Sequence, residues 1–307
     1  MNTKLKTAVW LALGTAVISG TNNFLTKFAV TVIPNPTVFT FLKNAIVGLF
    51  LIGLILLFAR YKEIRQLQKN DWLKLAGIGI VGGGIPFILY FTGLTMTTAV
   101  SAAIIHKTLF IWVALLAVPI LKERVGWIQG AAFVLLIAGN FVLGGLHSLA
   151  FGTGEMMILA ATLLWAGENI LAKHTLKNIS SLTVAGARMV FGSVIIFIVV
   201  LFQGKTSLLT GLNGEQWFWT LLPSVLLLGY VVTWYTALKH APATLVASIL
   251  VPATFITSFL QMIFIDQAMN PETLVTGVLY ALAIALLVWQ SLKVSSNATA
   301  DAERAHA

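Results

Sequence analysis

Two ionisable side chains lie deep within long apolar stretches of the sequence, and they are the groups best placed to do chemistry. Glu168 lies about 13 residues into a predicted helix, roughly 20 Å along its axis, and Lys107 lies about nine residues into another. A charge at the middle of a membrane costs roughly 2.5 to 3.5 kcal/mol, so each group needs a partner or a water-filled cavity. A carboxylate such as Glu168 suits an amine or a proton, and a lysine such as Lys107 suits a carboxylate or an amide.

The remaining ionisable groups in apolar stretches have plainer interpretations. His106 adjoins Lys107 and lies about 100° around the helix from it, so a packing role with a hydrogen bond is favoured over a pH-sensitive gate. Lys27, Lys43 and Arg188 lie nearer the ends of their helices. We expect these three to reach the headgroups or helix-end carbonyls, with substrate contact as the alternative.

Uncharged residues within the same stretches could complete a binding pocket. The amides of Asn23 and Asn169 suit a carboxylate or an amide, and four deep aromatic side chains suit an apolar or cationic group. Those aromatic residues are Tyr90, Trp165, Trp234 and Tyr235. Core packing is the competing interpretation for each of them.

Glycine and proline interrupt two of the stretches. The run that contains Gly83 and Gly84 is followed by Pro86, and Pro252 interrupts a later stretch. We favour a hinge or a cavity wall at these points, because interrupted helices often border transport sites. Close packing against small residues is the alternative.

Composition defines the surroundings of these residues. The chain has 307 residues, of which 58% are hydrophobic and 9% are charged, against roughly 25% charged residues in an ordinary soluble domain. The net charge of +9 would suggest nucleic acid in a soluble protein, but the basic residues lie in short gaps between apolar stretches, so we predict no nucleic-acid partner. There is no cysteine, and the five histidines show no ligand spacing. We therefore predict no metal and no cofactor.

Ten stretches are long enough to cross a bilayer, which takes about 20 apolar residues as a helix. They are Thr7 to Val30, Thr37 to Ala59, Trp72 to Leu94, Thr98 to Leu121, Gly126 to Leu146, Glu155 to Leu176, Ser181 to Phe202, Trp217 to Leu238, Pro242 to Ile265, and Glu272 to Leu292. The predicted fold class is therefore an all-α integral membrane protein with ten transmembrane helices.

Charge fixes the predicted orientation. If the N-terminus is cytoplasmic, nearly every lysine and arginine at a helix end or in a loop lies inside, and the outer loops contain only Lys205. The positive-inside rule then places both termini in the cytoplasm of a multi-pass protein of the plasma membrane. We expect the polar tail, residues 294–307, to be disordered.

The two halves of the chain repeat one another. Lys27 matches Lys173 at an offset of 146 residues, within Asn-x-x-x-Lys patterns that begin at Asn23 and Asn169, and Lys43 matches Arg188 at an offset of 145. We predict two repeats, 1–148 and 149–293, each with five helices. Because five is odd, the second repeat enters the membrane in the opposite sense, as in many secondary transporters.

The chain resembles the drug/metabolite transporter superfamily, specifically its ten-helix EamA-type members. The Asn-x-x-x-Lys patterns, the basic residues Lys43 and Arg188, Trp165, and the pair Glu123-Arg124 at the end of the fourth helix carry the resemblance. Asp266-Gln267 replaces that pair in the second half. Pro252 matches the family's mid-helix proline, whereas Thr108 stands at the matching position of the fourth helix.

The resemblance implies a central cavity lined by helices 1, 3, 4, 6, 8 and 9. That cavity would bring Lys107 and Glu168 together, as an ion pair that either couples protons or only orders the helices. It also implies transport of amino acids, other metabolites or toxic compounds. We expect an exporter of a small metabolite such as an amino acid, with alternating access and proton coupling, whose partners are a small-molecule substrate, protons and the lipid bilayer. Ten helices can enclose a site, so we expect a functional monomer.

Other function classes lack their signatures. An intramembrane enzyme would need a catalytic motif, which is not present, and the sequence has only one deep carboxylate where an acid–base pair would need two groups, so no catalytic residue is predicted. ATP-driven transport would need a Gly-x-x-x-x-Gly-Lys-Ser/Thr loop. A channel would need a polar stripe or a ring of like charges. A channel-like or other non-transport membrane protein is kept as the alternative.

Overall fold

The helices begin at residues that satisfy free backbone amides. In the computed structural model, which describes residues 3–33, 35–144 and 152–306, the side chain of Asn35 accepts a hydrogen bond from the amide of Val38 at 3.0 Å, ahead of Pro36. Thr98 accepts in the same way from the amide of Ser101 at 3.1 Å. Such N-caps replace the hydrogen bonds that the first turn of a helix cannot make.

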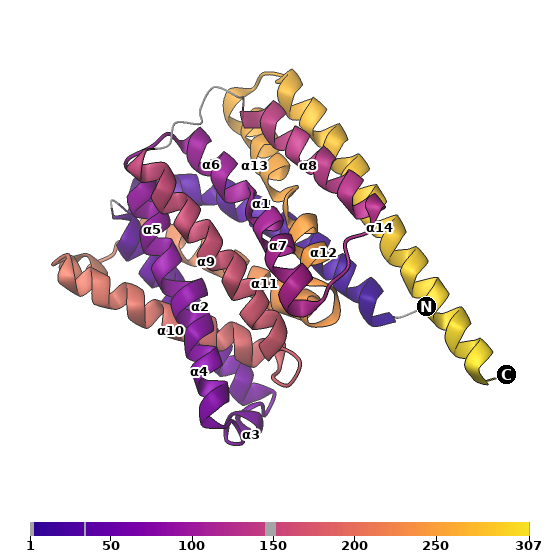
Figure 1. Ribbon diagram of the computed structural model, residues 1–307. Coiled ribbons are helices and arrows are strands. Elements are labelled where there is room, and N and C mark those ends of the chain that lie inside the picture. Colours follow the sequence, from indigo (N-terminus) through magenta and orange to yellow (C-terminus); the bar gives the residue numbers. More distant parts are fainter. Residues whose placement is uncertain (1–2, 34, 145–151, 307) are drawn as a thin grey trace.

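Ten apolar segments cross the described structure (Figure 1). In chain order their helices are α1 (Thr3–Val32), α2 (Pro36–Leu57), α4 (Lys69–Ile78) with η1 (Gly79–Gly84) and α5 (Ile85–Leu94), α6 (Ala99–Lys107) with α7 (Leu109–Leu121), α8 (Trp127–Gly144), α9 (Thr153–Thr175), α10 (Ser181–Phe202), α11 (Gly214–His240), α12 (Ala243–Leu250) with α13 (Ala253–Gln261) and η3 (Met262–Asp266), and α14 (Pro271–His306). Short helices α3 (Tyr61–Ile64) and η2 (Thr206–Leu209) lie in loops. Within the described residues, nine of the segments are long and apolar enough to span a membrane, and α8 is a shorter apolar helix. The predicted fold class is confirmed.

The packing follows an inverted duplication. Helix α1 of the first half packs on α11 of the second half, and their counterparts in the repeat, α9 and α5, pack on each other in the same way. Three helices of the first half each pack on their own counterpart in the second half: α2 on α10, α7 on α12, and α8 on α14. Figure 1 shows the last of these pairs, α8 and α14, side by side along one edge. This exchange of partners is what two five-helix repeats in opposite orientations require.

Carboxylates of the first half cap helices of the second half. Glu123, just after α7, accepts hydrogen bonds from the amides of Ala243 and Thr244 at 2.7 and 3.0 Å, at the start of α12. Glu63 accepts from the amide of Ser180 at 2.7 Å, at the start of α10. A negative charge at a helix N-terminus also complements the helix dipole. The two halves are therefore joined by polar contacts at their loops as well as by apolar packing.

The C-terminal tail differs from the prediction of disorder. Helix α14 continues through residues 294–306 to His306 and projects beyond the bundle (Figure 1). The reason lies in the sequence from Asn297 to His306, in which four of the ten residues are alanine. Alanine has the highest intrinsic helix propensity, and this segment extends a helix that is already nucleated.

The helix interruptions fall where glycine and proline predicted them. Gly83 and Gly84 belong to the π-helical segment η1, which ends just before Pro86 in the first turn of α5. Pro252 separates α12 from α13. A Cβ atom on Gly83 would lie 2.3 Å from the carbonyl oxygen of Arg188. Only glycine allows η1 and α10 to approach this closely, and a hinge role for these segments stays a prediction.

Candidate functional site

A buried carboxylate lies where α9, α10, α11 and η1 converge. Glu168 on α9 is 2% exposed, and its Oε1 accepts a hydrogen bond from the hydroxyl of Tyr235 on α11 at 2.5 Å. Tyr235 is fully buried, and Arg188 on α10 is 7% exposed. A hydrogen bond to an ionised group is roughly twice as strong as a neutral one. The Tyr235 hydroxyl is thus a fixed donor to this carboxylate.

Arg188 neighbours Glu168 without touching it. The two groups interact electrostatically, but in the part of the chain that the structure describes, the one ion pair within 4.0 Å is Lys74–Asp71. The Nη2 of Arg188 donates instead to the backbone carbonyl of Gly82 in η1 at 3.2 Å, and its Nε is buried without a partner. A buried guanidinium with an unused donor is poised to take another acceptor.

Trp165 connects Glu168 and Arg188 to a row of rings formed by Trp165, His106 and Tyr90, which we call the aromatic wall. Its indole Nε1 donates to the Gly82 carbonyl at 3.0 Å, the same oxygen that Arg188 contacts. Its ring lies 4.8 Å from the ring of His106, which lies 5.4 Å from the ring of Tyr90. We call Glu168, Arg188, Tyr235, Trp165 and the Gly82 carbonyl the Glu168 cluster.

The sequence around Gly82 makes this geometry possible. A Cβ atom at Gly82 would lie 2.4 Å from Cγ and 2.9 Å from Cδ of Glu168, and 3.2 Å from Nε of Arg188. Any side chain there would displace the carboxylate, and glycine also leaves the carbonyl open to two donors. Glu168 lies about seven residues before the end of α9, and Arg188 about seven residues after the start of α10, so both lie roughly 10 Å from the same face.

Lys107 does not join the cluster, and the predicted Lys107–Glu168 pair is wrong. Lys107 is the last residue of α6, and its side chain makes no ion pair within 4.0 Å among the described residues. The ring of the adjacent His106 packs on Trp165, and a role of Lys107 as a substrate contact stays a prediction. Tyr235 and Arg188 take the places beside Glu168 that were assigned to Lys107.

The other predicted residues divide between the cluster and its surroundings. Asn169 is buried, donates to the carbonyl of Trp165 at 2.8 Å and leaves its Oδ1 without a partner. Trp234 is buried and stacks on Tyr230, with ring centroids 6.0 Å apart. Asn23 is exposed on α1, one turn before Lys27, which donates to Gln261 on α13. Asn169 thus adjoins the cluster through Trp165, whereas Asn23 lies on α1 and Trp234 contacts Tyr230.

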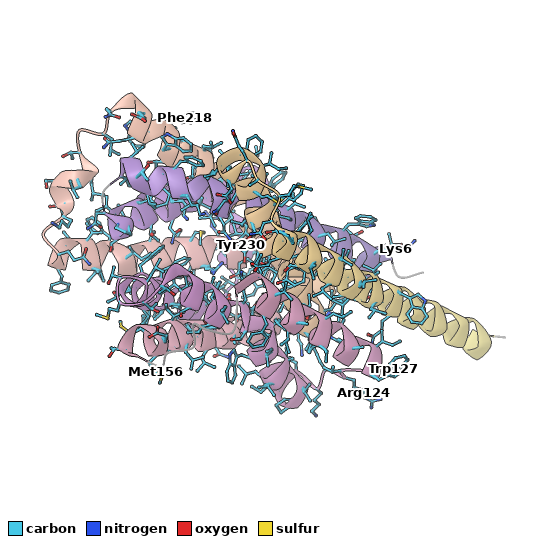
Figure 2. The ribbon with its side chains drawn as sticks, turned by 90° about the horizontal axis from the view of Figure 1, so that it is seen from above. Lys6, Arg124, Trp127, Met156, Phe218 and Tyr230 are labelled. Carbon is cyan, nitrogen blue, oxygen red and sulfur yellow. The ribbon has the colours of Figure 1, made fainter. Side chains whose placement is uncertain are left out.

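Sequence reasoning missed two components of the site. Arg188 was expected at the headgroups or at helix-end carbonyls, with substrate contact as the alternative. It is buried beside Glu168 and donates to the Gly82 carbonyl within η1, and Lys43 is likewise only 8% exposed. The equal depth of Arg188 and Glu168 from one face was the available signal. Tyr230, which interacts electrostatically with Arg188, gave no such signal. Figure 2 shows Tyr230 between one end of the bundle with Lys6, Arg124 and Trp127 and the other with Met156 and Phe218.

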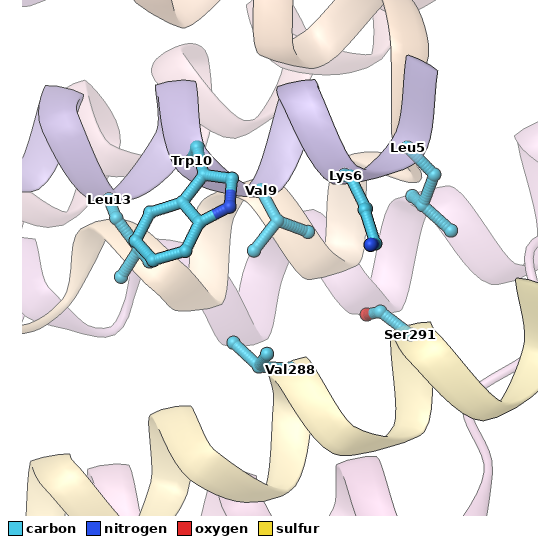
Figure 3. A pocket seen from close by; sticks show the side chains of 7 residues that line it. All are labelled: Leu5, Lys6, Val9, Trp10, Leu13, Val288 and Ser291. Carbon is cyan, nitrogen blue, oxygen red and sulfur yellow. The ribbon is translucent and has the colours of Figure 1, made fainter. Parts of the chain in front are cut away.

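A cavity of about 250 Å³ lies between α1 and α14, away from the predicted site residues (Figure 3). It is mostly apolar, with Lys6 and Ser291 facing each other across it. The Glu168 cluster contributes no residue to this cavity, whose lining comprises Leu5, Lys6, Val9, Trp10, Leu13, Val288 and Ser291.

The profile of the EamA-like transporter family matches the chain twice, over residues 6–145 and 152–289. The chain belongs to this family. It is similar to an uncharacterized transporter from Methanothermobacter thermautotrophicus, with 22% identity over 73% of this chain and 66% of the relative. It is also similar to the uncharacterized transporter YyaM of Bacillus subtilis, with 29% identity over 62% of this chain and 65% of the relative. The matched regions thus span just under two thirds of these relatives.

A solved crystal structure shares the fold. It superposes with a TM-score of 0.77 at 16% identity, and covers 94% of this chain and 99% of the other. The EamA profile and the apolar helices together make this chain a multi-pass membrane protein of a transporter family. Both relatives are named transporters.

Proposed function

We propose that this chain is a secondary transporter that exports a small polar or amphipathic metabolite, such as an amino acid, and that Glu168 binds the coupling proton. The observation that carries the proposal is a buried carboxylate held by Tyr235 and neighboured by an arginine that does not contact it. A carboxylate at this depth is expensive unless it has a function or full compensation. Here the compensation is incomplete, because the nearest cation donates to a backbone carbonyl.

Proton binding to Glu168 would change what holds three helices together. The ionised carboxylate attracts Arg188 on α10 and accepts the hydroxyl of Tyr235 on α11. A protonated carboxyl loses the charge attraction and turns the Tyr235 contact into a neutral hydrogen bond. Because α9, α10 and η1 meet at this point, the two protonation states favour different packings of the bundle. A ligand shifts such an equilibrium by its differential affinity for the two states.

The substrate would reach the cluster along the aromatic wall. His106 Nδ1 and Asn169 Oδ1 are buried polar atoms without a protein partner, and both residues contact Trp165. Buried polar atoms are rarely left unsatisfied, so these two are suited to hydrogen bonds with a solute. An amine would compete with the proton for Glu168, and Tyr90 and Trp165 would hold an apolar or cationic portion.

Several finer expectations belong to the same proposal. They are the plasma membrane location, cytoplasmic termini, the monomeric state, the repeat boundary at residues 148 and 149, and hinge roles for η1 and Pro252. The basic loops support the orientation. No observation on the described residues favours a channel or an intramembrane enzyme over transport.

Uptake and counterflow in proteoliposomes test this function. The solutes would be radiolabelled amino acids, small carboxylates and cationic drugs, measured with and without an imposed pH gradient. We expect saturable movement of one class, and steeper movement under the gradient. Absence of movement for every solute, from protein shown to be folded, would contradict the proposal.

A further inference from the structure

Lys43 on α2 is a buried cation that makes no ion pair among the described residues. It is 8% exposed, and its Nζ lies 5.2 Å from the centroid of the Phe39 ring, one turn away on the same helix. Among the described residues, no carboxylate lies within 4.0 Å of this ammonium group. A cation–π contact returns only about 0.5 to 2 kcal/mol, which is less than the cost of burying an ammonium group.

The internal repeat shows what is missing beside Lys43. Lys43 corresponds to Arg188 at an offset of 145 residues, and the register that relates Asn23 to Asn169 relates Asn22 to Glu168. The second half thus places a carboxylate near its buried cation, whereas the first half has an amide at the matching position. Asn22 is 8% exposed, and its Oδ1 has no hydrogen-bond partner.

Helix α11 packs on both α1 and α2, and the three helices place these residues at a similar depth. Ala29 of α1, Ile33 just after α1 and Phe39 of α2 form one buried apolar cluster with Trp219 of α11 packed on it, near the turn that joins α1 to α2. One turn deeper, roughly 5 to 6 Å at about 1.5 Å per residue, α2 presents Lys43 and α1 presents Thr26. The hydroxyl of Thr26 is also buried without a partner. Asn22 lies one further turn along α1.

We propose that Lys43 and Thr26, with the neutral Asn22 one turn away, form an anion-binding subsite that receives the carboxylate of the transported solute. A carboxylate only accepts hydrogen bonds, and the Lys43 ammonium and the Thr26 hydroxyl are donors. The neutral Asn22 leaves the positive charge uncompensated until an anion arrives. The repeats are inverted, so this subsite lies toward the face opposite the Glu168 cluster. Its assignment to a transported solute depends on the proposed function, whereas anion binding itself does not.

Anion-dependent thermal unfolding of the purified chain in detergent tests the subsite. The probes are sodium acetate and sodium chloride at constant ionic strength, which distinguish a carboxylate site from a general halide site. We expect acetate to raise the unfolding midpoint by about 3 to 5 °C when it is about tenfold above its Kd. Chloride should raise it by less.

Three variants make the result specific. Lys43→Gln should lose the acetate-dependent rise, and Lys43→Arg should keep it. Asn22→Asp should also lose it, because the new carboxylate supplies the counterion that Glu168 supplies in the other half. Lys205→Gln, in an exposed loop, is the matched control and should behave as the wild type.

A wild type that acetate does not stabilise, or a Lys43→Gln and an Asn22→Asp variant that acetate still stabilises, would overturn the subsite. A greater rise with chloride would overturn its carboxylate character. If acetate stabilises the protein through Lys43 while no solute of the panel moves in proteoliposomes, the subsite stands and the proposed function fails. If solutes move and acetate has no effect, the proposed function stands and the subsite fails.

Discussion

Replacing Gly82 by alanine should disrupt the Glu168 cluster while leaving the identity of each of its side chains unchanged. The added Cβ would lie 2.4 Å from Cγ and 2.9 Å from Cδ of Glu168, which are distances at which the carboxylate must move. Overpacking of this kind costs about 1 to 3 kcal/mol. Loss of the charged hydrogen bond from Tyr235 costs about 1.5 to 3 kcal/mol more. Alanine regains about 1 kcal/mol of helix propensity, so we expect a net loss of about 1.5 to 5 kcal/mol.

The matched control is Gly167→Ala, next to Glu168 on α9. A Cβ atom at Gly167 would meet nothing within 4 Å, so this change should be neutral or stabilising by up to about 1 kcal/mol. The assays are the thermal unfolding midpoint in detergent and the initial rate of solute uptake in proteoliposomes. Gly82→Ala should lower both, and Gly167→Ala should leave both near the wild-type values. Wild-type stability and uptake in Gly82→Ala would refute the close packing of η1 on α9 as the basis of the site.

Two further changes address single contacts. Tyr235→Phe should lower the unfolding midpoint and uptake through the loss of its 2.5 Å hydrogen bond to Glu168, at a cost of about 1.5 to 3 kcal/mol. An equal loss of uptake from Tyr280→Phe, a buried tyrosine on α14 whose hydroxyl donates to Asn140 on α8, would argue against a specific role. Glu123→Gln should weaken the cap on α12, whose first amides lie 2.7 and 3.0 Å from the carboxylate. We expect a loss of about 1 kcal/mol in the free energy of unfolding, measured by thermal unfolding. An unchanged midpoint would show that the cap is dispensable.

Span lengths and the repeat predicted the architecture because both are properties of the linear sequence. Twenty apolar residues define a helix that can cross a bilayer, and the matches Lys27 to Lys173 and Lys43 to Arg188 define a duplication. The odd number of helices in each repeat then requires inversion. None of these steps depends on which side of a helix a residue occupies.

The site was less predictable because it depends on direction around each helix. Depth identified Glu168, but α10 is apolar on all sides, so its sequence does not say which face turns inward. Arg188 was therefore expected at the headgroups or at helix-end carbonyls, although it lies beside Glu168. Lys107 has the appropriate depth but makes no ion pair with Glu168 among the described residues. The role of Gly82 depends on its backbone carbonyl. Every residue has such a carbonyl, so the residue type gives no signal for this role.

The exchange and net-flux activities of Glu168→Gln test the central claim most directly. With the solute that the panel identifies, proteoliposomes would be assayed for counterflow without a pH gradient and for accumulation under one. Glu215→Gln, an exposed carboxylate in the first turn of α11, is the control. We predict that Glu168→Gln retains counterflow and loses gradient-driven accumulation, because a side chain that cannot release a proton can exchange solute but cannot couple it. Gradient-driven accumulation by Glu168→Gln at the wild-type rate would contradict the account.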